Sequence, residues 1–185
     1  MMHEITFHGR GGQGAVTSAE LLALAAIDEG KDARSFPSFG PERRGAPVRA
    51  FARVSDQPIR DRTAVRTPSV VLVLDPSLPG LVKVDDGLRA DGLMIINSTK
   101  SIAELRKLFG FKSRLGVIDA NKVAREVIGR VITNTTMLGA LVAALPLVKP
   151  ESIEKRLEER FGRLAAKNIA AFRRAQQECV VQDAV

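Results

Sequence analysis

Short apolar runs alternate with segments of helical periodicity along this chain. The runs at residues 70–74, 93–96 and 115–118 are continuous, which is typical of strands covered on both faces in a parallel sheet. Residues 4–8 and 48–54 instead alternate between apolar and polar positions, and the second of these segments predicts a half-exposed strand. In full, the predicted strands cover residues 4–8, 31–36, 48–54, 70–74, 93–96 and 115–118.

Apolar residues at helical spacing predict the elements between and after these strands. The predicted helices cover residues 15–29, 101–108, 121–128, 134–145, 151–160 and 163–178. This order indicates one three-layer α/β/α domain over residues 1–185, with a mostly parallel, Rossmann-like sheet and C-terminal helices.

The longest apolar run, residues 137–148, predicts that the helix at 134–145 is buried. The run contains Pro146 and is about a dozen residues long, whereas a bilayer span needs roughly 20. Residues 1–4 lack the basic segment of an export signal. We therefore expect a cytoplasmic chain that does not enter a membrane.

Composition narrows the chemistry that the chain can carry. It is 45% hydrophobic and 26% charged, so it can bury a core. The single cysteine, Cys179, excludes a disulfide framework, a four-cysteine zinc site and a cysteine-ligated iron–sulfur cluster held by this chain alone. We expect it to be a packing residue in the last turn of the final helix.

His3 precedes the first predicted strand and His8 ends it, so the two histidines do not converge. We therefore expect no catalytic or metal-binding residues.

The glycine cluster Gly9–Gly14 is the strongest local motif. It satisfies G-x-G-x-x-G directly after a predicted strand and directly before a helix. Glycines let backbone amides approach a phosphate, the helix N-terminus adds positive potential, and Arg10 is expected to add more. A tight turn without a ligand is the alternative.

A dinucleotide site needs an acidic residue roughly 20 positions beyond such a loop to hold the ribose hydroxyls. Arg34 stands there, which argues against NAD. A phosphorylated ribose, as in NADP or coenzyme A, would tolerate Arg34, Arg43 or Arg44.

Two further segments carry candidate chemistry. Residues 37–47 contain three prolines and two glycines, which predicts an irregular loop in which Arg43 and Arg44 either clamp an anion or are merely solvated. Asn134 opens the buried helix, where it either caps the helix or faces a ligand. Asp75, Asn97, Ser98 and Asp119 follow other strands and would share the same edge of the sheet.

Three motifs together resemble the gamma subunit of 2-oxoacid:ferredoxin oxidoreductases. Residues 9–17 are similar to the signature that opens this subunit, residues 36–48 to its second signature and residues 134–140 to a third. Their order, their spacing and the total length agree over nearly the whole chain.

The resemblance implies a subunit rather than a complete enzyme. Enzymes of this family decarboxylate a 2-oxoacid on thiamine diphosphate, pass electrons through iron–sulfur clusters and release acyl-CoA. Thiamine diphosphate, Mg and the clusters would lie on alpha, beta and delta-type partner subunits, with ferredoxin or another acceptor receiving the electrons. This chain would contribute assembly contacts and part of the coenzyme A site.

The motifs also carry residue roles over to this chain. The glycine loop would approach coenzyme A, the two arginines would lie near its phosphates, and the asparagine would lie beside its adenosine part. The residues concerned are Gly11, Gly12, Gln13, Gly14, Arg43, Arg44 and Asn134.

The sequence of residues 42–47 is more similar to that of the pyruvate-type gamma subunits than to that of the 2-oxoglutarate type. Relatives that act on branched-chain or aryl 2-oxoacids, such as phenylglyoxylate, carry very similar sequences. A stand-alone NADP or nucleotide-binding protein is a further alternative. A nucleic-acid binder is disfavoured despite the net charge of +7, because acidic residues are interleaved with the basic ones and no recognition motif is present.

Overall fold

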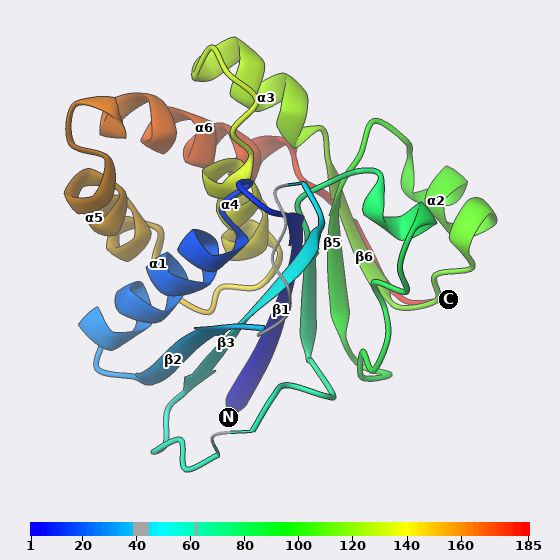
Figure 1. Cartoon of the computed structure of the whole chain (residues 1–185), viewed down its shortest axis with the longest axis horizontal. Coiled ribbons are helices and arrows are strands. Elements are labelled where there is room, and N and C mark those ends of the chain that lie inside the picture. The colour runs from blue at the N-terminus through cyan, green and yellow to red at the C-terminus, as the bar shows by residue number, and fades with distance from the viewer. Residues whose placement is uncertain (39–44, 62) are drawn as a thin grey trace.

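In the computed structural model, which describes residues 1–38, 45–61 and 63–185, seven strands form one sheet (Figure 1). The strands are β1 (Met2–Arg10), β2 (Asp32–Pro37), β3 (Pro47–Ser55), β4 (Val70–Val73), β5 (Leu93–Asn97), β6 (Arg114–Ile118) and β7 (Val180–Gln182). The helices are α1 (Ala15–Asp28), α2 (Ile102–Phe109), α3 (Ala120–Val127), α4 (Asn134–Ala144), α5 (Pro150–Phe161) and α6 (Ala165–Glu178), with 3-10 turns η1 (Leu78–Gly80) and η2 (Gly162–Leu164).

The strand order is β2-β3-β1-β4-β5-β6-β7. Strands β1, β4, β5 and β6 pair in parallel, whereas β3 is antiparallel to both of its neighbours, β1 and β2. Strand β2 therefore runs in the same direction as the parallel set, and β7 closes the other edge antiparallel to β6. The predicted α/β class with a mostly parallel sheet is confirmed.

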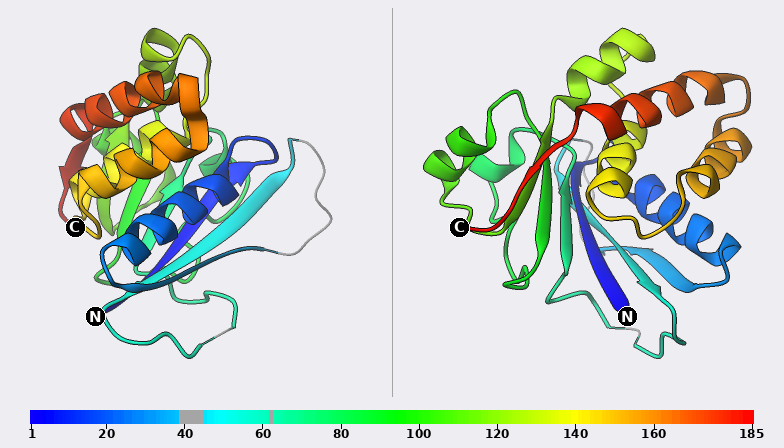
Figure 2. Two further views of the ribbon diagram at one scale, coloured as in Figure 1. Left: turned by 90° about the vertical axis from the view of Figure 1, so that its left-hand side faces the viewer. Right: turned by 180° about the vertical axis from the view of Figure 1, so that it is seen from behind.

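The two faces of the sheet are covered unequally (Figure 2). Helices α1, α3, α4, α5 and α6 lie on one face, where Phe7, Leu72 and Ile95 join their apolar side chains in the larger core. On the other face α2 and η1 cover β4, β5 and β6 and enclose a smaller core that includes Val71 and Met94. Alternate residues of each strand thus serve opposite layers, as the period of two requires.

Several predicted boundaries shift in the structure. Strand β1 is longer than residues 4–8, so His3 lies within it rather than before it. The prediction of an irregular segment over the whole of 37–47 is wrong at both ends, because Pro37 ends β2 and Pro47 begins β3. A proline is tolerated at these positions, since an edge strand and the first residue of a strand do not need every amide for the ladder. Residues 39–44 of this segment lie outside the described residues.

The C-terminal end of the chain adds a strand that the pattern did not predict. Cys179 follows α6 as its extended C-cap residue, not in its last turn, and β7 starts directly after it. The side chain packs against the larger core, and burial raises the pKa of its thiol to about 11. The thiol is therefore protonated at neutral pH, as suits a packing residue.

Helix α4 is buried along nearly its whole length, as predicted. It packs so closely on α6 that a Cβ atom added to Gly139 would lie 2.2 Å from the carbonyl oxygen of Phe172. The hydroxyl of Thr135 donates to Oδ1 of Asn168 across the same interface at 3.1 Å. Glycine at position 139 thus sets the distance between the two helices.

Within the described residues, no helix has the length and apolar character needed to cross a membrane.

The close contact at Gly139 predicts how one added methyl group would change the stability of the fold. Gly139→Ala should lower the free energy of unfolding by about 2–4 kcal/mol, even though alanine has the higher helix propensity, because α4 and α6 must separate. Gly80→Ala is the matched control, because a Cβ there meets no atom within 4 Å. Urea midpoints of the two variants would decide, and an equally stable Gly139→Ala protein would contradict this account of the α4–α6 packing.

Candidate functional site

The carboxyl ends of the parallel strands bring several predicted residues to one edge of the sheet. The glycine loop, defined here as residues 9–14, follows β1 and leads into α1. Strand β4 ends beside it, and the amide of Leu74 donates to the carbonyl of His8 at 2.8 Å. Open α/β sheets bind ligands at such an edge.

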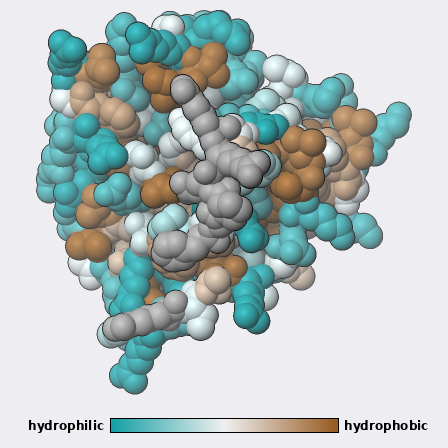
Figure 3. Space-filling view, viewed as in Figure 1, coloured by the Kyte–Doolittle hydropathy of each residue, from teal (hydrophilic) through white to brown (hydrophobic). Residues whose placement is uncertain are grey.

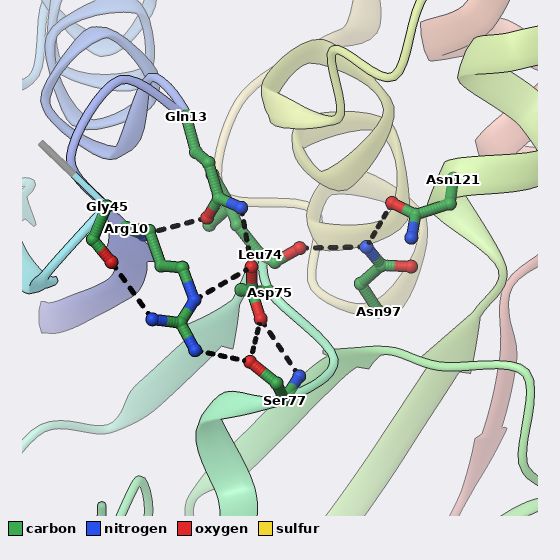
Figure 4. Close-up of polar contacts among 8 residues, drawn as sticks. All are labelled: Arg10, Gln13, Gly45, Leu74, Asp75, Ser77, Asn97 and Asn121. Carbon is green, nitrogen blue, oxygen red and sulfur yellow. Dashed lines mark hydrogen bonds and ion pairs between the residues drawn. The ribbon is translucent and has the colours of Figure 1, made fainter. Parts of the chain in front are cut away.

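A polar network centred on Asp75 holds the glycine loop in place (Figure 4). Nε2 of Gln13 donates to Asp75 at 2.6 Å, and Nε of Arg10 lies 3.3 Å from the same carboxylate oxygen. The other carboxylate oxygen accepts from the amide of Ser77 at 2.9 Å and from its hydroxyl. Burial would raise the pKa of Asp75, but the hydrogen bonds from Ser77 and Gln13 and the charge of Arg10 outweigh it and lower the pKa.

The network also engages Arg10 and Gln13, which the sequence analysis placed among the candidate ligand-binding residues. The guanidinium of Arg10 donates to the Gly45 carbonyl at 2.9 Å and to the Ser77 hydroxyl at 2.7 Å, so its donors are engaged by the protein itself. The Gln13 side chain accepts from the Arg10 amide at 2.7 Å, and the Gln13 amide donates to the Arg10 carbonyl at 3.0 Å. Gln13 therefore shapes the loop through its side chain and backbone alike.

Several backbone amides of the glycine loop stay free to donate to an anion. Gly12 and Gly14 have positive φ angles of 93° and 82°, which favour glycine, and a Cβ at Gly12 would meet no atom within 4 Å. Their amides, like those of Ala15, Val16 and Thr17 in the first turn of α1, have no hydrogen-bond acceptor among the described residues. Such a cluster of free amides at a helix N-terminus favours negative charge.

The second motif is tied to the first. The amide of Gly11 donates to the carbonyl of Ala46 at 3.0 Å, and the amide of Gly45 approaches the carbonyl of Gly11 at 3.4 Å. Gly45 and Ala46 directly follow the two candidate arginines in the chain, and both contact the backbone of the glycine loop. Arg43 and Arg44 themselves lie outside the described residues.

Asn134 brings the third motif to the same place. It is 4% exposed, and a Cβ added to Gly14 would lie 2.8 Å from its side-chain nitrogen. It does not cap α4, because Thr133 occupies the N-cap position and makes no side-chain cap hydrogen bond. Its Oδ1 atom is buried and has no hydrogen-bond partner among the described residues. A buried acceptor without a donor is uncommon and indicates a place for a ligand or water donor.

The other polar residues at the strand ends have local roles. Asp119 caps α3 by accepting from the Lys122 amide at 2.9 Å, and Ser98 accepts from the Lys100 amide at 3.0 Å. Asn97 donates to the Leu74 carbonyl at 2.8 Å and to Asn121 at 3.0 Å (Figure 4), which joins the ends of β4 and β5 to α3. Sequence reasoning missed Ser77, whose only signal is its position two residues after Asp75.

His8 and His3 point to opposite faces of β1, because they are five residues apart in a strand. Burial, and then the charge of Arg49, lower the pKa of His8 to about 4, although a hydrogen bond with the Val84 backbone opposes the shift. His8 is therefore neutral at physiological pH.

Comparisons with known proteins agree on one family. The family model described as pyruvate ferredoxin/flavodoxin oxidoreductase matches residues 4–178. A "Pyruvate/ketoisovalerate oxidoreductases common subunit gamma" from Thermococcus litoralis is 50% identical over 98% of this chain and 100% of its own length. The chain belongs to the pyruvate ferredoxin/flavodoxin oxidoreductase family.

Two further relatives place the chain among the gamma-type members of this family, which confirms the resemblance drawn from the three motifs. A "Pyruvate synthase subunit PorC" from Methanothermobacter thermautotrophicus is 46% identical over 96% of each chain. The crystal structure of pyruvate oxidoreductase subunit PORC from Thermotoga maritima superposes with a TM-score of 0.87 at 39% identity, covering 98% of this chain and 99% of that one.

Removing the central acceptor of the network should destabilise this gamma-type chain. Asp75→Ala leaves the donors of Arg10, Gln13 and Ser77 without their acceptor, so the free energy of unfolding should fall by about 2–4 kcal/mol. Asp91→Ala is the control, because Asp91 is exposed and pairs only with Arg89 among the described residues. Equal urea midpoints for the two variants would show that the network does not stabilise the fold.

The depressed pKa of His8 predicts a pH dependence. The unfolded state binds more protons than the folded state between pH 6.5 and about 4, so stability is complete above this window and falls as the pH drops through it. From pH 7 to 4.5 the wild type should lose roughly 2 kcal/mol more than a His8→Asn variant. The same pH slope of unfolding free energy in both proteins would refute the assignment to His8.

Proposed function

We propose that this chain is the gamma subunit of a multisubunit 2-oxoacid:acceptor oxidoreductase, which converts a 2-oxoacid and coenzyme A to acyl-CoA and CO2. The observation that carries the proposal is the match to gamma and PorC chains from end to end at about half identity.

Pyruvate is the 2-oxoacid that the relatives' names favour. The Methanothermobacter and Thermotoga relatives are named for pyruvate alone. The Thermococcus relative is named as common to pyruvate and ketoisovalerate oxidoreductases. We therefore infer a pyruvate-type complex, with a branched-chain 2-oxoacid as the second candidate substrate.

The reaction centre belongs to partner subunits in this proposal. Among the described residues, no group of three or more His, Cys, Asp or Glu side chains could hold a metal ion, and the one thiol is half-buried. Thiamine diphosphate and iron–sulfur clusters on alpha, beta and delta-type subunits would supply decarboxylation and electron transfer to ferredoxin or another acceptor. This chain would bind part of coenzyme A and hold the partners together.

Large apolar side chains stand exposed at several places on the chain, among them Ile27, Leu81, Leu108 and Val131. Figure 3 shows apolar patches among hydrophilic residues on one face. Partner subunits that cover such patches would bury them, which supports a role as one chain of a larger assembly.

The glycine loop is the part of this chain that suits coenzyme A. The free amides of Gly12, Gly14 and the first turn of α1 suit a phosphate group. The buried, unpartnered Oδ1 of Asn134 suits a donor on the adenosine part. Because Gly45 is tied to the loop, we assign Arg43 and Arg44, which directly precede it in the chain, to the same ligand. Arg34 stands opposite Arg53, which in turn stands opposite Glu4 near the start of β1, so Arg34 does not serve this loop.

The two arginines give this assignment a test in the assembled complex. Arg43→Ala combined with Arg44→Ala should raise the KM for coenzyme A roughly 10- to 100-fold, because charge-assisted contacts to phosphate are lost. The KM for the 2-oxoacid should not change. Arg163→Ala combined with Lys167→Ala, at exposed positions near the start of α6, is the matched control. An unchanged KM for coenzyme A would remove these arginines from the site.

Anoxic affinity purification through a tag on this chain tests the subunit assignment itself. We expect larger chains to co-elute with iron and thiamine diphosphate, and the eluate to oxidise a 2-oxoacid only when coenzyme A is present. A panel of 2-oxoacids then identifies the substrate. A chain that elutes alone, colourless and without thiamine, and that binds NADPH saturably, would instead be a stand-alone nucleotide-binding protein.

A further inference from the structure

Among the described residues, no helix covers the second face of the sheet over β1, β2 and β3. Strand register places Phe36, Phe51 and Thr6 side by side across this half of the face, and Arg49 opposite His8. The smaller core with α2 and η1 is confined to β4, β5 and β6. Irregular chain around residues 64–68 is what borders the uncovered half.

A cavity of about 530 Å³ lies on this uncovered half. Its apolar part includes Phe36, Phe51 and Val65, and the two phenylalanine rings lie 5.4 Å apart between centroids. Thr6 and His8 contribute buried polar groups. None of residues 9–14 lines this cavity, although Phe36, Pro37 and Ser38 come from the start of the second motif.

Three cationic side chains around the cavity have no acidic partner among the described residues. Arg49, Arg66 and Lys83 line it and are exposed, and none of them forms an ion pair with a described residue. Arg49 lies only over the Phe51 ring, at 5.9 Å from its centroid. The contrast is Arg53 on the same face, which is 1% exposed and pairs with Glu4 at 2.8 Å and with Asp61 at 3.5 Å.

The charge of the cavity is positive at neutral pH. The described residues that line it include three cations and one carboxylate, Asp86, and together these four carry a formal charge of +2. His8 is neutral and does not add to this charge. An apolar floor with an exposed basic rim complements a partner that offers an apolar side chain flanked by carboxylates.

We propose that this cavity, between Phe36, Phe51, Arg49, Arg66 and Lys83, is the docking site for an acidic segment of a larger subunit of the same complex. A protein segment suits the site better than a small ligand, because all three cations stand on the exposed rim rather than inside the cavity. An apolar anchor of the segment would lie on the phenylalanine rings, and aspartate or glutamate beside it would meet the rim. The proposal rests on the subunit function proposed above.

Charge reversal in the co-expressed complex tests the docking site. Arg49→Glu combined with Lys83→Glu should weaken retention of this chain by the larger subunits at least about tenfold, and wild-type retention should fall with added salt. Arg163→Glu combined with Lys167→Glu is the matched control, because it changes the net charge equally at exposed positions away from the cavity. The control should assemble like the wild type.

A photocrosslink identifies the occupant and does not depend on the stability of the charge-reversed variant. Phe36→p-benzoylphenylalanine in the assembled complex should crosslink to an acid-rich peptide of a larger subunit, whereas the same group at Leu164 should not reach that peptide. Failure of the wild-type chain to assemble at all would refute the subunit function. Normal assembly with a crosslink to this chain, to a second copy of it or to nothing would overturn the docking site alone.

Discussion

A contact with no room for a methyl group joins the beginnings of α1 and α4, and the arrangement of the ligand-facing edge depends on it. Asn134 packs directly on Gly14, whose positive φ turns the chain from β1 into α1. The hydroxyl of Ser18 in the first turn of α1 also approaches the carbonyl of Asn134, at 3.5 Å. Two helix N-termini, more than a hundred residues apart in the chain, are thereby held at one point of the sheet edge.

The charges of the chain fall into two groups with different physical roles. Arg10 and Arg53 are held by carboxylates inside the fold, Arg10 by Asp75 and Arg53 by Glu4 and Asp61. These pairs fix a loop and a sheet face, and they present little net charge to a ligand. Arg49, Arg66 and Lys83 are unpaired among the described residues and lie where the sheet is uncovered. Their positive field is therefore available to an external partner.

The neutralisation of Arg10 changes how the glycine loop can attract an anion. Because Asp75 compensates the guanidinium, a coenzyme A phosphate bound as proposed would be attracted by backbone dipoles and by cations outside the loop, rather than by the arginine in the motif. A site built from amides is rigid and selects for shape. The same network engages both polar atoms of the Gln13 side chain, so this side chain maintains the geometry of the loop.

The sequence by itself determined the fold class, the order of the elements as far as α6, and the family, because hydrophobic periodicity and three spaced motifs are local properties of the chain. It also identified the glycine loop and Asn134 as candidates. Only the tertiary structure decided that Asp75 and Ser77 bind Arg10, that Asn134 touches Gly14, and that the described helices leave half of one sheet face uncovered beside three cations without an ion pair among the described residues. These facts depend on strand order and helix packing, which bring distant residues together, and no pattern along the chain specifies which polar side chains meet.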